Sequence, residues 1–307
     1  MRAYQHHARY IAQLIGAVLL YALSSHIAAQ EKGPVYECPA EPTAQKDVRA
    51  KVLASLEKTT PKTRDAKGLI SAHAVRLKQG AGQPMVLVDV RSTEAFAQVR
   101  IPGALNIPLY ALRTKSFLKS QHIVLVDTGA AYDALAKTAS RLKTAGFKTV
   151  SILDGGMNAW RRAKGPTVGN PLAQQRLMAL TPQQYFTERD YDHWLMVDIS
   201  SAKTQAQTKL FANTIKVPYH KDEQRFLSAL KKKLAKRKAK GKTFVVLVDE
   251  EGINNQRLAA LANDLDNAQV FYLDGGLKAY GNFYQSQKTL MLAQAKGNPG
   301  PKQRCQL

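Results

Sequence analysis

One pattern of segments occurs twice in this chain, and it constrains the fold more than any other feature. An apolar run ends at an acidic residue, Asp127 in the first copy and Asp249 in the second, and a helical pattern follows each. A further apolar run then ends in Asp-Gly-Gly, at residues 154–156 and 274–276. Strand, loop, helix and strand in this order are typical of parallel α/β sheets. The chain is therefore predicted to be an internal duplication of one α/β unit.

The two copies differ by an insertion. Asp89 and Asp198 each end an earlier apolar run, so the copies can be aligned on these two residues. The next matched acids, Asp127 and Asp249, are farther apart than the first pair, so the second copy has gained residues between Asp198 and Asp249. This gain coincides with a lysine-rich segment around residues 231–242.

Residues 1–29 have the layout of a signal peptide. Arg2 and Arg9 precede an apolar core at residues 11–23, and small residues that end at Ala29 follow. The core is shorter than the roughly 20 apolar residues of a membrane-spanning helix. We expect cleavage after Ala29 and export, either to the periplasm or out of the cell. A retained membrane anchor is the alternative.

Two cysteines, Cys38 and Cys305, lie near opposite ends of the exported chain. Neither follows an apolar strand pattern or opens a glycine-containing loop, so neither is expected to be a nucleophile. In an oxidising compartment they are expected either to form a disulfide that joins the two ends or to remain two unpaired thiols.

The composition supports two globular domains, because the chain has 307 residues of which 45% are hydrophobic. The formal net charge of +22 attracts anions over long range but carries no information about the fold.

Ser71 and Thr181 are expected to cap the first helix of each repeat. The expected parts are a signal peptide (1–29), an N-terminal extension with a short helix (30–65), a first domain (66–165), a linker (166–178), a second domain with a lysine-rich helical insertion (179–288) and a C-terminal tail (289–307).

Three motifs follow one another in the first copy. They are Asp-Val-Arg at residues 89–91, Ile-Pro-Gly-Ala-Leu-Asn-Ile-Pro at residues 101–108 and Gly-Gly-Met-Asn-Ala-Trp at residues 155–160. On these motifs the chain resembles the rhodanese family. The second copy keeps them in part, with Asp-Ile-Ser at residues 198–200 and Gly-Gly-Leu-Lys-Ala-Tyr at residues 275–280. The resemblance implies two tandem rhodanese-like α/β domains, each with a mainly parallel central sheet and helices on both faces.

The resemblance also implies where a catalytic cysteine would lie, and this chain has Asp127 and Asp249 at those positions. In catalytic rhodaneses the loop N–H groups lower the pKa of the thiol and hold the persulfide sulfur. A carboxylate cannot accept that sulfur, and Tyr132 and Asn254 stand near the place of the arginine that often closes the loop. We therefore expect no catalytic residue. The degenerate loops consist of Asp127, Thr128, Gly129, Ala130, Ala131 and Tyr132 in the first copy and Asp249, Glu250, Glu251, Gly252, Ile253 and Asn254 in the second.

Two roles are open for the loop aspartates. Each carboxylate can accept hydrogen bonds from its own loop and cap the helix that follows. Each could instead be a nucleophile of the phosphoryl-transfer kind. That chemistry needs a second acid to bind magnesium, and the corresponding residues are Gly129, which has no carboxylate, and Glu251, which matches poorly. We favour the structural role and expect no metal and no cofactor.

Other matched residues are expected to support the fold. The resemblance implies that Asp89, Arg91 and Glu94 brace the first loop from behind, with Glu94 paired to Arg91. Trp160 and Tyr280 occupy equivalent places and are expected to anchor the two cores.

A cationic helix is predicted in the insertion of the second copy. Phe226 and Leu230 recur at helical spacing, which leaves the basic residues on the opposite face. This face is expected to contain Lys231, Lys232, Lys233, Lys236, Arg237, Lys238 and Lys240. It is either a solvated surface or a binding surface for a protein or an anionic envelope component. The membrane surface is a further candidate, and nucleic acid is not expected.

Two functions follow from these features. The first is a non-catalytic rhodanese-like protein of the cell envelope that acts as a binding or scaffold module. The alternative is a thiosulfate or other sulfurtransferase, or a sulfur carrier, on the analogy of the fold alone. The missing loop cysteines favour the first function.

Overall fold

The computed structural model describes residues 49–51, 53, 54, 56, 60–200, 211, 213–237, 242–265 and 268–295. These residues belong to one compact unit, Asp47–Asn298. The expected signal peptide, Cys38, Cys305, Lys238 and Lys240 lie outside the described residues. Within the described part of the chain, none of the helices combines the length and the apolar character that crossing a membrane requires.

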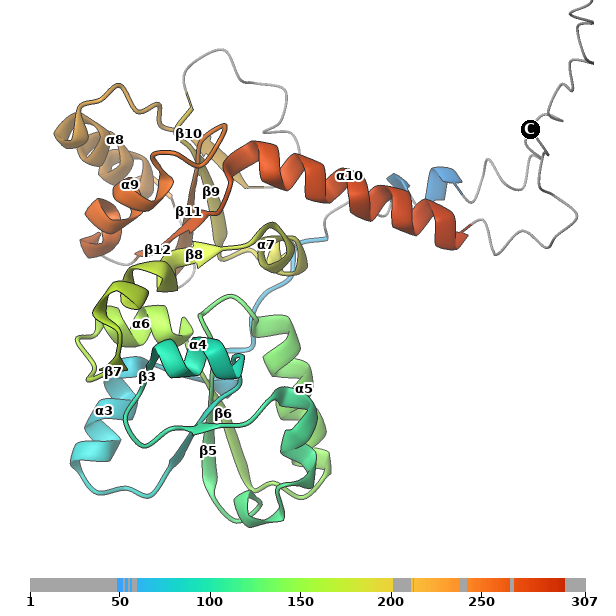
Figure 1. The fold of residues 1–307 in the computed structure, drawn as a ribbon, viewed down its shortest axis with the longest axis vertical. Helices are drawn as coiled ribbons and strands as arrows, with labels where there is room; N and C mark the ends of the chain where they lie inside the picture. Colours follow the sequence, from blue (N-terminus) through green and yellow to red (C-terminus); the bar gives the residue numbers. More distant parts are fainter. Residues whose placement is uncertain are drawn as a thin grey trace, which may run out of the picture. The chain divides into compact units, whose positions relative to one another are not determined.

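The first repeat contains a five-stranded sheet in which every neighbouring pair is parallel (Figure 1). The strand order is β1-β6-β5-β2-β4. The strands are β1 (Leu69–Ile70), β2 (Val86–Asp89), β4 (Leu105–Asn106), β5 (His122–Val126) and β6 (Thr149–Leu153). Two further short strands, β3 (Val99–Arg100) and β7 (Val168–Gly169), pair antiparallel to each other.

The second repeat contains a sheet with the same order. Its strands are β8 (Ala179–Leu180), β9 (Trp194–Asp198), β10 (Thr214–Lys216), β11 (Thr243–Val248) and β12 (Ala268–Leu273). Read from β8, the order is β8-β12-β11-β9-β10, and every pair is again parallel. Each strand therefore has a counterpart in the first sheet at the same place. The duplication predicted from the sequence is confirmed at the level of topology.

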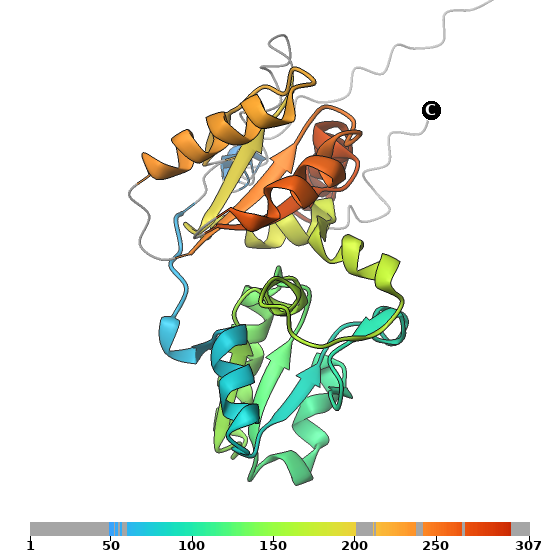
Figure 2. The ribbon, with the colours of Figure 1, turned by 90° about the vertical axis from the view of Figure 1, so that its left-hand side faces the viewer.

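The helices alternate with the strands along the chain and flank the sheet of each repeat in space (Figures 1 and 2). Those of the first repeat and the connection that follows it are η1 (Ala66–Gly68), α3 (Ala72–Gly80), α4 (Thr93–Gln98), η2 (Leu109–Thr114), η3 (Ser116–Leu118), α5 (Tyr132–Thr144), α6 (Gly156–Arg162) and η4 (Pro171–Met178). Those of the second are α7 (Pro182–Glu188), α8 (Glu223–Ala235), α9 (Asn255–Leu261), η6 (Ala262–Asp264) and α10 (Gly276–Ala295).

Alternate residues of the central strand β5 belong to two different cores. Ile123 and Leu125 pack with α5, η2 and η3 on one face of the sheet. Val124 and Val126 pack with α3 and α6 on the other. Since both faces are buried, the strand is continuously apolar rather than alternating. The predicted fold, a parallel sheet with helices on both faces, is confirmed for this repeat.

The second repeat is built in the same way. Val245 and Leu247 of strand β11 pack with α8 and α9. Val246 and Val248 of the same strand pack with α7 and α10. Trp160 and Tyr280 are fully buried, each in the helix that follows the last strand of its five-stranded sheet. Their predicted role as core anchors is confirmed.

Both predicted helix caps are present. The Ser71 hydroxyl accepts a hydrogen bond from the Ala74 amide at 3.1 Å. Thr181 and Gln184 form a reciprocal capping box, with bonds of 3.2 and 2.9 Å. Such caps each stabilise a helix by about 0.5–2 kcal/mol, so they fix where α3 and α7 begin.

The segment expected to be the linker, 166–178, connects the two five-stranded sheets. It contains β7 and η4, and its Leu177 and Met178 are buried. Helix α10 continues to Ala295, past the expected end of the second domain at residue 288.

The N-terminal segment 60–65 contacts both repeats. The Lys62 amide donates to the Asp190 carbonyl at 2.8 Å, and the Asp192 amide donates to the Lys62 carbonyl at 2.9 Å. Arg64 forms an ion pair with Asp154 at 2.5 Å and lies over the Phe244 ring. This part of the expected extension is therefore integral to the fold.

Candidate functional site

The first degenerate loop begins where β5 ends and leads into α5. Asp127 is 5% exposed, and its Oδ2 accepts a hydrogen bond from the Ala130 amide at 3.0 Å. Burial raises the pKa of the Asp127 carboxyl, while the amides of Gly129, Ala130 and Ala131 oppose this shift. The loop amides thus converge on the carboxylate from within the loop.

The second loop is arranged in the same way around Asp249. Its Oδ1 accepts from the Gly252 amide, and its Oδ2 accepts from the Asn254 amide at 3.0 Å. Asn255 holds the strand end in place, because its side chain accepts from the Asp249 amide and donates to the Leu273 carbonyl, both at 2.9 Å.

The expected hydrogen bonds within each loop are therefore present, but the expected helix caps are not. The donors to Asp127 lie before α5 begins at Tyr132, and those to Asp249 lie no later than Asn254, the residue before α9. The two carboxylates therefore order their loops, and neither accepts a hydrogen bond from an amide of the helix that follows it.

The Gly-Gly motif explains how each loop is closed. Gly156 has a φ of 54°, and a Cβ there would collide with the Asp127 carbonyl and the Gly129 amide. Gly276 has a φ of 64°, and a Cβ there would collide with the Asp249 carbonyl. The next helix can thus approach the loop closely enough for Met157 to donate its amide to the Asp127 carbonyl at 2.7 Å.

The first loop is covered rather than open. The cavity beside Asp127 measures about 10 Å³ and is also lined by Arg64, Tyr132 and Asp154. A single water needs about this much space, so there is no room here for a substrate. The Tyr132 hydroxyl accepts from the Asp65 amide at 2.7 Å, which holds the N-terminal segment over the loop.

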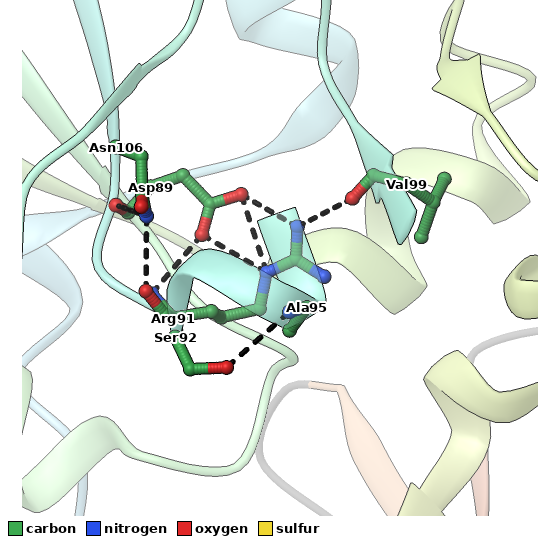
Figure 3. A network of polar contacts seen from close by, with 6 residues as sticks. All are labelled: Asp89, Arg91, Ser92, Ala95, Val99 and Asn106. Carbon is green, nitrogen blue, oxygen red and sulfur yellow. Dashed lines mark hydrogen bonds and ion pairs between the residues drawn. The ribbon is translucent and has the colours of Figure 1, made fainter. Parts of the chain in front are cut away.

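A buried ion pair braces the strand next to the loop (Figure 3). The Arg91 guanidinium donates to the Asp89 carboxylate at 2.6 Å and to the Val99 carbonyl at 2.7 Å. The Asn106 side chain donates to the carbonyls of Asp89 and Arg91 at 3.0 and 2.9 Å. Asp89 and Arg91 therefore support the strand end as expected.

Glu94 does not complete this brace, so the expected Arg91–Glu94 pair is wrong. Glu94 is exposed in the first turn of α4, where its own backbone amide and Ser92 lower the pKa of its carboxyl. Asp89 is closer along the strand and takes the guanidinium instead. In the second repeat the Ser200 amide and hydroxyl bind Asp198 in place of an arginine.

Residues 71–163 match the family model described as the rhodanese-like domain. These residues form a rhodanese-like domain. The matched range runs from the cap of α3 to the end of α6, and it includes the first degenerate loop and the Asp89–Arg91 brace.

Three known proteins illustrate the similarity. The HTH-type transcriptional regulator Rv0324 of Mycobacterium tuberculosis is 37% identical over 91 residues, which are 29% of this chain and 39% of that regulator. The Alr3790 protein from Anabaena sp. is 28% identical over 35% of this chain and 97% of the solved chain, with a TM-score of 0.30. Thiosulfate sulfurtransferase from Pseudomonas aeruginosa is 20% identical over 74% of this chain and 47% of that one, with a TM-score of 0.31.

Sequence reasoning missed a carboxylate that reaches the rhodanese-like domain from the second repeat. Glu188 of α7 is fully buried, and its Oε1 accepts from the Asp133 amide in the first turn of α5 at 2.8 Å. Burial, together with the nearby Asp127 and Asp133 carboxylates, raises the pKa of the Glu188 carboxyl to about 7, and the hydrogen bond from the Asp133 amide opposes this shift. Glu188 and Asp133 are far apart in the sequence, so no local motif could reveal this contact.

The cationic helix is present as α8, which buries Phe226 and Leu230. Lys231, Lys232, Lys233 and Lys236 are exposed. Arg237 is an exception, because it donates to the Asp192 carbonyl at 3.1 Å and burial lowers the pKa of its guanidinium. The described part of the cationic face therefore consists of lysines, and Arg237 belongs to the contacts that hold the helix end.

Proposed function

We propose that this protein is a non-catalytic, tandem rhodanese-like binding module of the cell envelope. One observation carries the proposal: in both loops an aspartate carboxylate accepts the amide hydrogen bonds at the position where the family resemblance places a nucleophilic cysteine. The equal strand order of the two sheets supports a rhodanese-like second domain.

The chemistry of sulfur transfer argues against catalysis at these loops. The reaction requires a thiolate that attacks a sulfur atom, carries it as a persulfide and releases it to an acceptor. A carboxylate oxygen cannot carry sulfur in this way. The Asp127 carboxylate also lies beside a cavity of about 10 Å³, which is too small for thiosulfate.

The binding partner that fits this module is an anionic surface or an acidic protein. Four exposed lysines follow one another along and just beyond α8, and the whole chain has a formal net charge of +22. The order of charged, apolar and small residues in 1–29 supports export, which would place this surface in the envelope. There it would meet anionic polymers and lipid headgroups.

A sulfurtransferase assay tests the non-catalytic proposal. The purified full-length chain would be incubated with cyanide and either thiosulfate or 3-mercaptopyruvate, and thiocyanate would be measured. We expect no product above the protein-free blank. The variants Asp127→Cys and Asp249→Cys would show whether restoring a thiol alone restores transfer, and we expect at most a trace.

Two results would contradict the proposal. Multiple turnover by the unmutated protein would show that it is an enzyme. If this turnover disappeared in Cys38→Ser or Cys305→Ser, the sulfur chemistry would reside in the chain ends rather than in the loops.

A further inference from the structure

The edge at which the parallel strands of the first sheet begin carries a group of basic residues. This basal edge lies opposite the edge that carries the first degenerate loop, because that loop follows the end of β5. Lys119 and Lys148 lie in the turns that lead into β5 and β6, and the Lys148 amide donates to the Lys119 carbonyl at 2.9 Å. The other four basal cations are Arg141 and Lys143 in the last turn of α5, Arg113 of η2 and Lys115 between η2 and η3.

The segments that form the basal edge contain no acid. Residues 107–126 and 134–153 include neither aspartate nor glutamate. None of the six basal cations forms an ion pair with an acidic residue that the structure describes. Lys115 is half-buried, and the other five are exposed. The edge therefore offers its positive charges to a partner outside the chain.

Two aromatic side chains protrude among these cations. Phe117 of η3 is 60% exposed, and Tyr110 of η2 is 87% exposed. Leu112 and Leu118, from the same two short helices, are fully buried in the core, so the helices are anchored while the two rings face solvent. Tyr110 lies on the same face of η2 as Arg113, because residues three apart are eclipsed in a 3-10 helix. The exposed rings and the cations therefore form one surface.

We propose that the basal edge docks on an anionic lipid membrane, with the Phe117 ring inserted among the headgroups and the basal cations placed over them. A bilayer supplies both hydrocarbon and negative charge, which this surface matches. A soluble polyanion supplies charge alone and would leave the rings in water. A folded acidic protein would need a pocket for two protruding rings, whereas a lipid surface deforms around them.

This surface differs from the lysine face of α8. The aromatic residue of α8, Phe226, is buried beneath the lysines, so α8 offers charge without an exposed ring. The basal edge also belongs to the first repeat, whereas α8 belongs to the second. The proposal holds whether or not the two degenerate loops are catalytic.

Tryptophan fluorescence of the variant Phe117→Trp, in the full-length chain, tests this docking. The two native tryptophans, Trp160 and Trp194, are buried, so the new indole would be exposed where they are not. Vesicles that contain phosphatidylglycerol should shift its emission to the blue, and brominated acyl chains should quench it, because the ring leaves water for the interface. Vesicles of phosphatidylcholine alone should give a much smaller change, since they lack the negative charge that attracts the cations.

Leu172→Trp is the matched control for insertion. Leu172 is 70% exposed in η4, which lies in the connection between the two sheets. An indole there should keep its emission even when another segment, such as residues 11–23 or α8, holds the chain at the vesicle. The comparison therefore separates docking by the basal edge from membrane binding by other parts of the chain.

A second comparison tests the charges in the Phe117→Trp background. Replacing Lys119 and Lys148 by glutamine should raise the lipid concentration at the half-maximal shift by about tenfold or more. Replacing Lys231 and Lys232 on α8 by glutamine removes the same charge and should have a much smaller effect.

Four results would overturn the proposal. They are an unshifted emission of Phe117→Trp with phosphatidylglycerol vesicles, equal shifts in Phe117→Trp and Leu172→Trp, equal effects of the two lysine pairs, and a full shift with soluble polyphosphate in place of vesicles. The last result would assign the basal edge to a polyanion instead of a membrane.

Discussion

At the scale of single residues, the buried carboxylates are distinguished by what neutralises them. Asp89 is fully buried and receives a guanidinium, whereas Asp127 is nearly buried and receives only loop amides. A full opposite charge compensates burial better than amide dipoles do, which agrees with the raised pKa of Asp127. The Asp89–Arg91 ion pair supports the end of the strand, whereas the loop amides around Asp127 keep its carboxylate inside the loop.

Removing Arg91 should reveal the strength of this brace. Arg91→Ala leaves the Asp89 carboxylate buried without its partner, which typically costs about 3–5 kcal/mol of unfolding free energy. Glu94→Ala is the matched control, because Glu94 is exposed and contacts its own helix turn. Urea unfolding of both variants should show a large loss for Arg91→Ala and a much smaller one for Glu94→Ala. Equal losses would mean that Glu94 belongs to the brace after all.

At the scale of elements, the helices that follow each Gly-Gly motif depend on the absence of a side chain. Gly156→Ala would place a Cβ against the Asp127 carbonyl and the Gly129 amide at a positive φ. We expect a loss of at least about 1–3 kcal/mol. In Gly281→Ala, within α10, the new Cβ has no atom within 4 Å, so the helix should gain about 0.5–1 kcal/mol. Thermal unfolding should therefore shift in opposite directions for the two variants.

The elements were largely predictable, because their signals are local. The run of residues 123–126 predicts a buried strand, and the structure has β5 there; Ser71 and Thr181 are the caps that their position indicates. The site was less predictable. The covering of the first loop by Arg64 and the capping of α5 by Glu188 depend on contacts between distant segments. Neither leaves a pattern in the sequence.

At the scale of the whole molecule, Glu188 connects the two repeats and makes the stability of the protein depend on pH. Arg64, Asp127 and Asp133 are the charged groups that act on it, and its pKa is raised from 4.5 to about 7. A carboxyl with a raised pKa is protonated more readily when folded, so the contribution of Glu188 to stability is fully present below about pH 4.5 and is lost as the pH rises through about 7. This contribution is on the order of 3 kcal/mol when complete.

The Glu188→Gln variant should remove that decline. Urea unfolding measured between about pH 5 and pH 8 should fall with pH in the wild type and stay flatter in the variant. The exposed Glu250→Gln serves as the control and should keep the wild-type slope. A wild-type slope in Glu188→Gln would show that this carboxyl is not the group that titrates.

The lysine face should give the molecule a salt-sensitive affinity for polyanions. Replacing Lys231, Lys232 and Lys233 by glutamine should lower the salt concentration needed to elute the protein from an immobilised polyanion, since fewer counterions are released on binding. Exposed charges are screened beyond about 10 Å at 0.1 M salt, so wild-type binding should also fall steeply with added salt. Unchanged elution by the triple variant would exclude α8 as the binding surface.

The contacts of the N-terminal segment 60–65 also constrain the order of events during synthesis. These residues leave the ribosome before either sheet exists, yet the backbone partners of Lys62, at Asp190 and Asp192, are translated only after the whole first sheet. The Lys62 hydrogen bonds must therefore wait for the second repeat, whereas Arg64 and Asp65 need only Asp154 and Tyr132 of the first. A nascent chain that stops short of residue 190 would hold the segment over the first loop by those two contacts alone, and the Lys62 bonds would be added last.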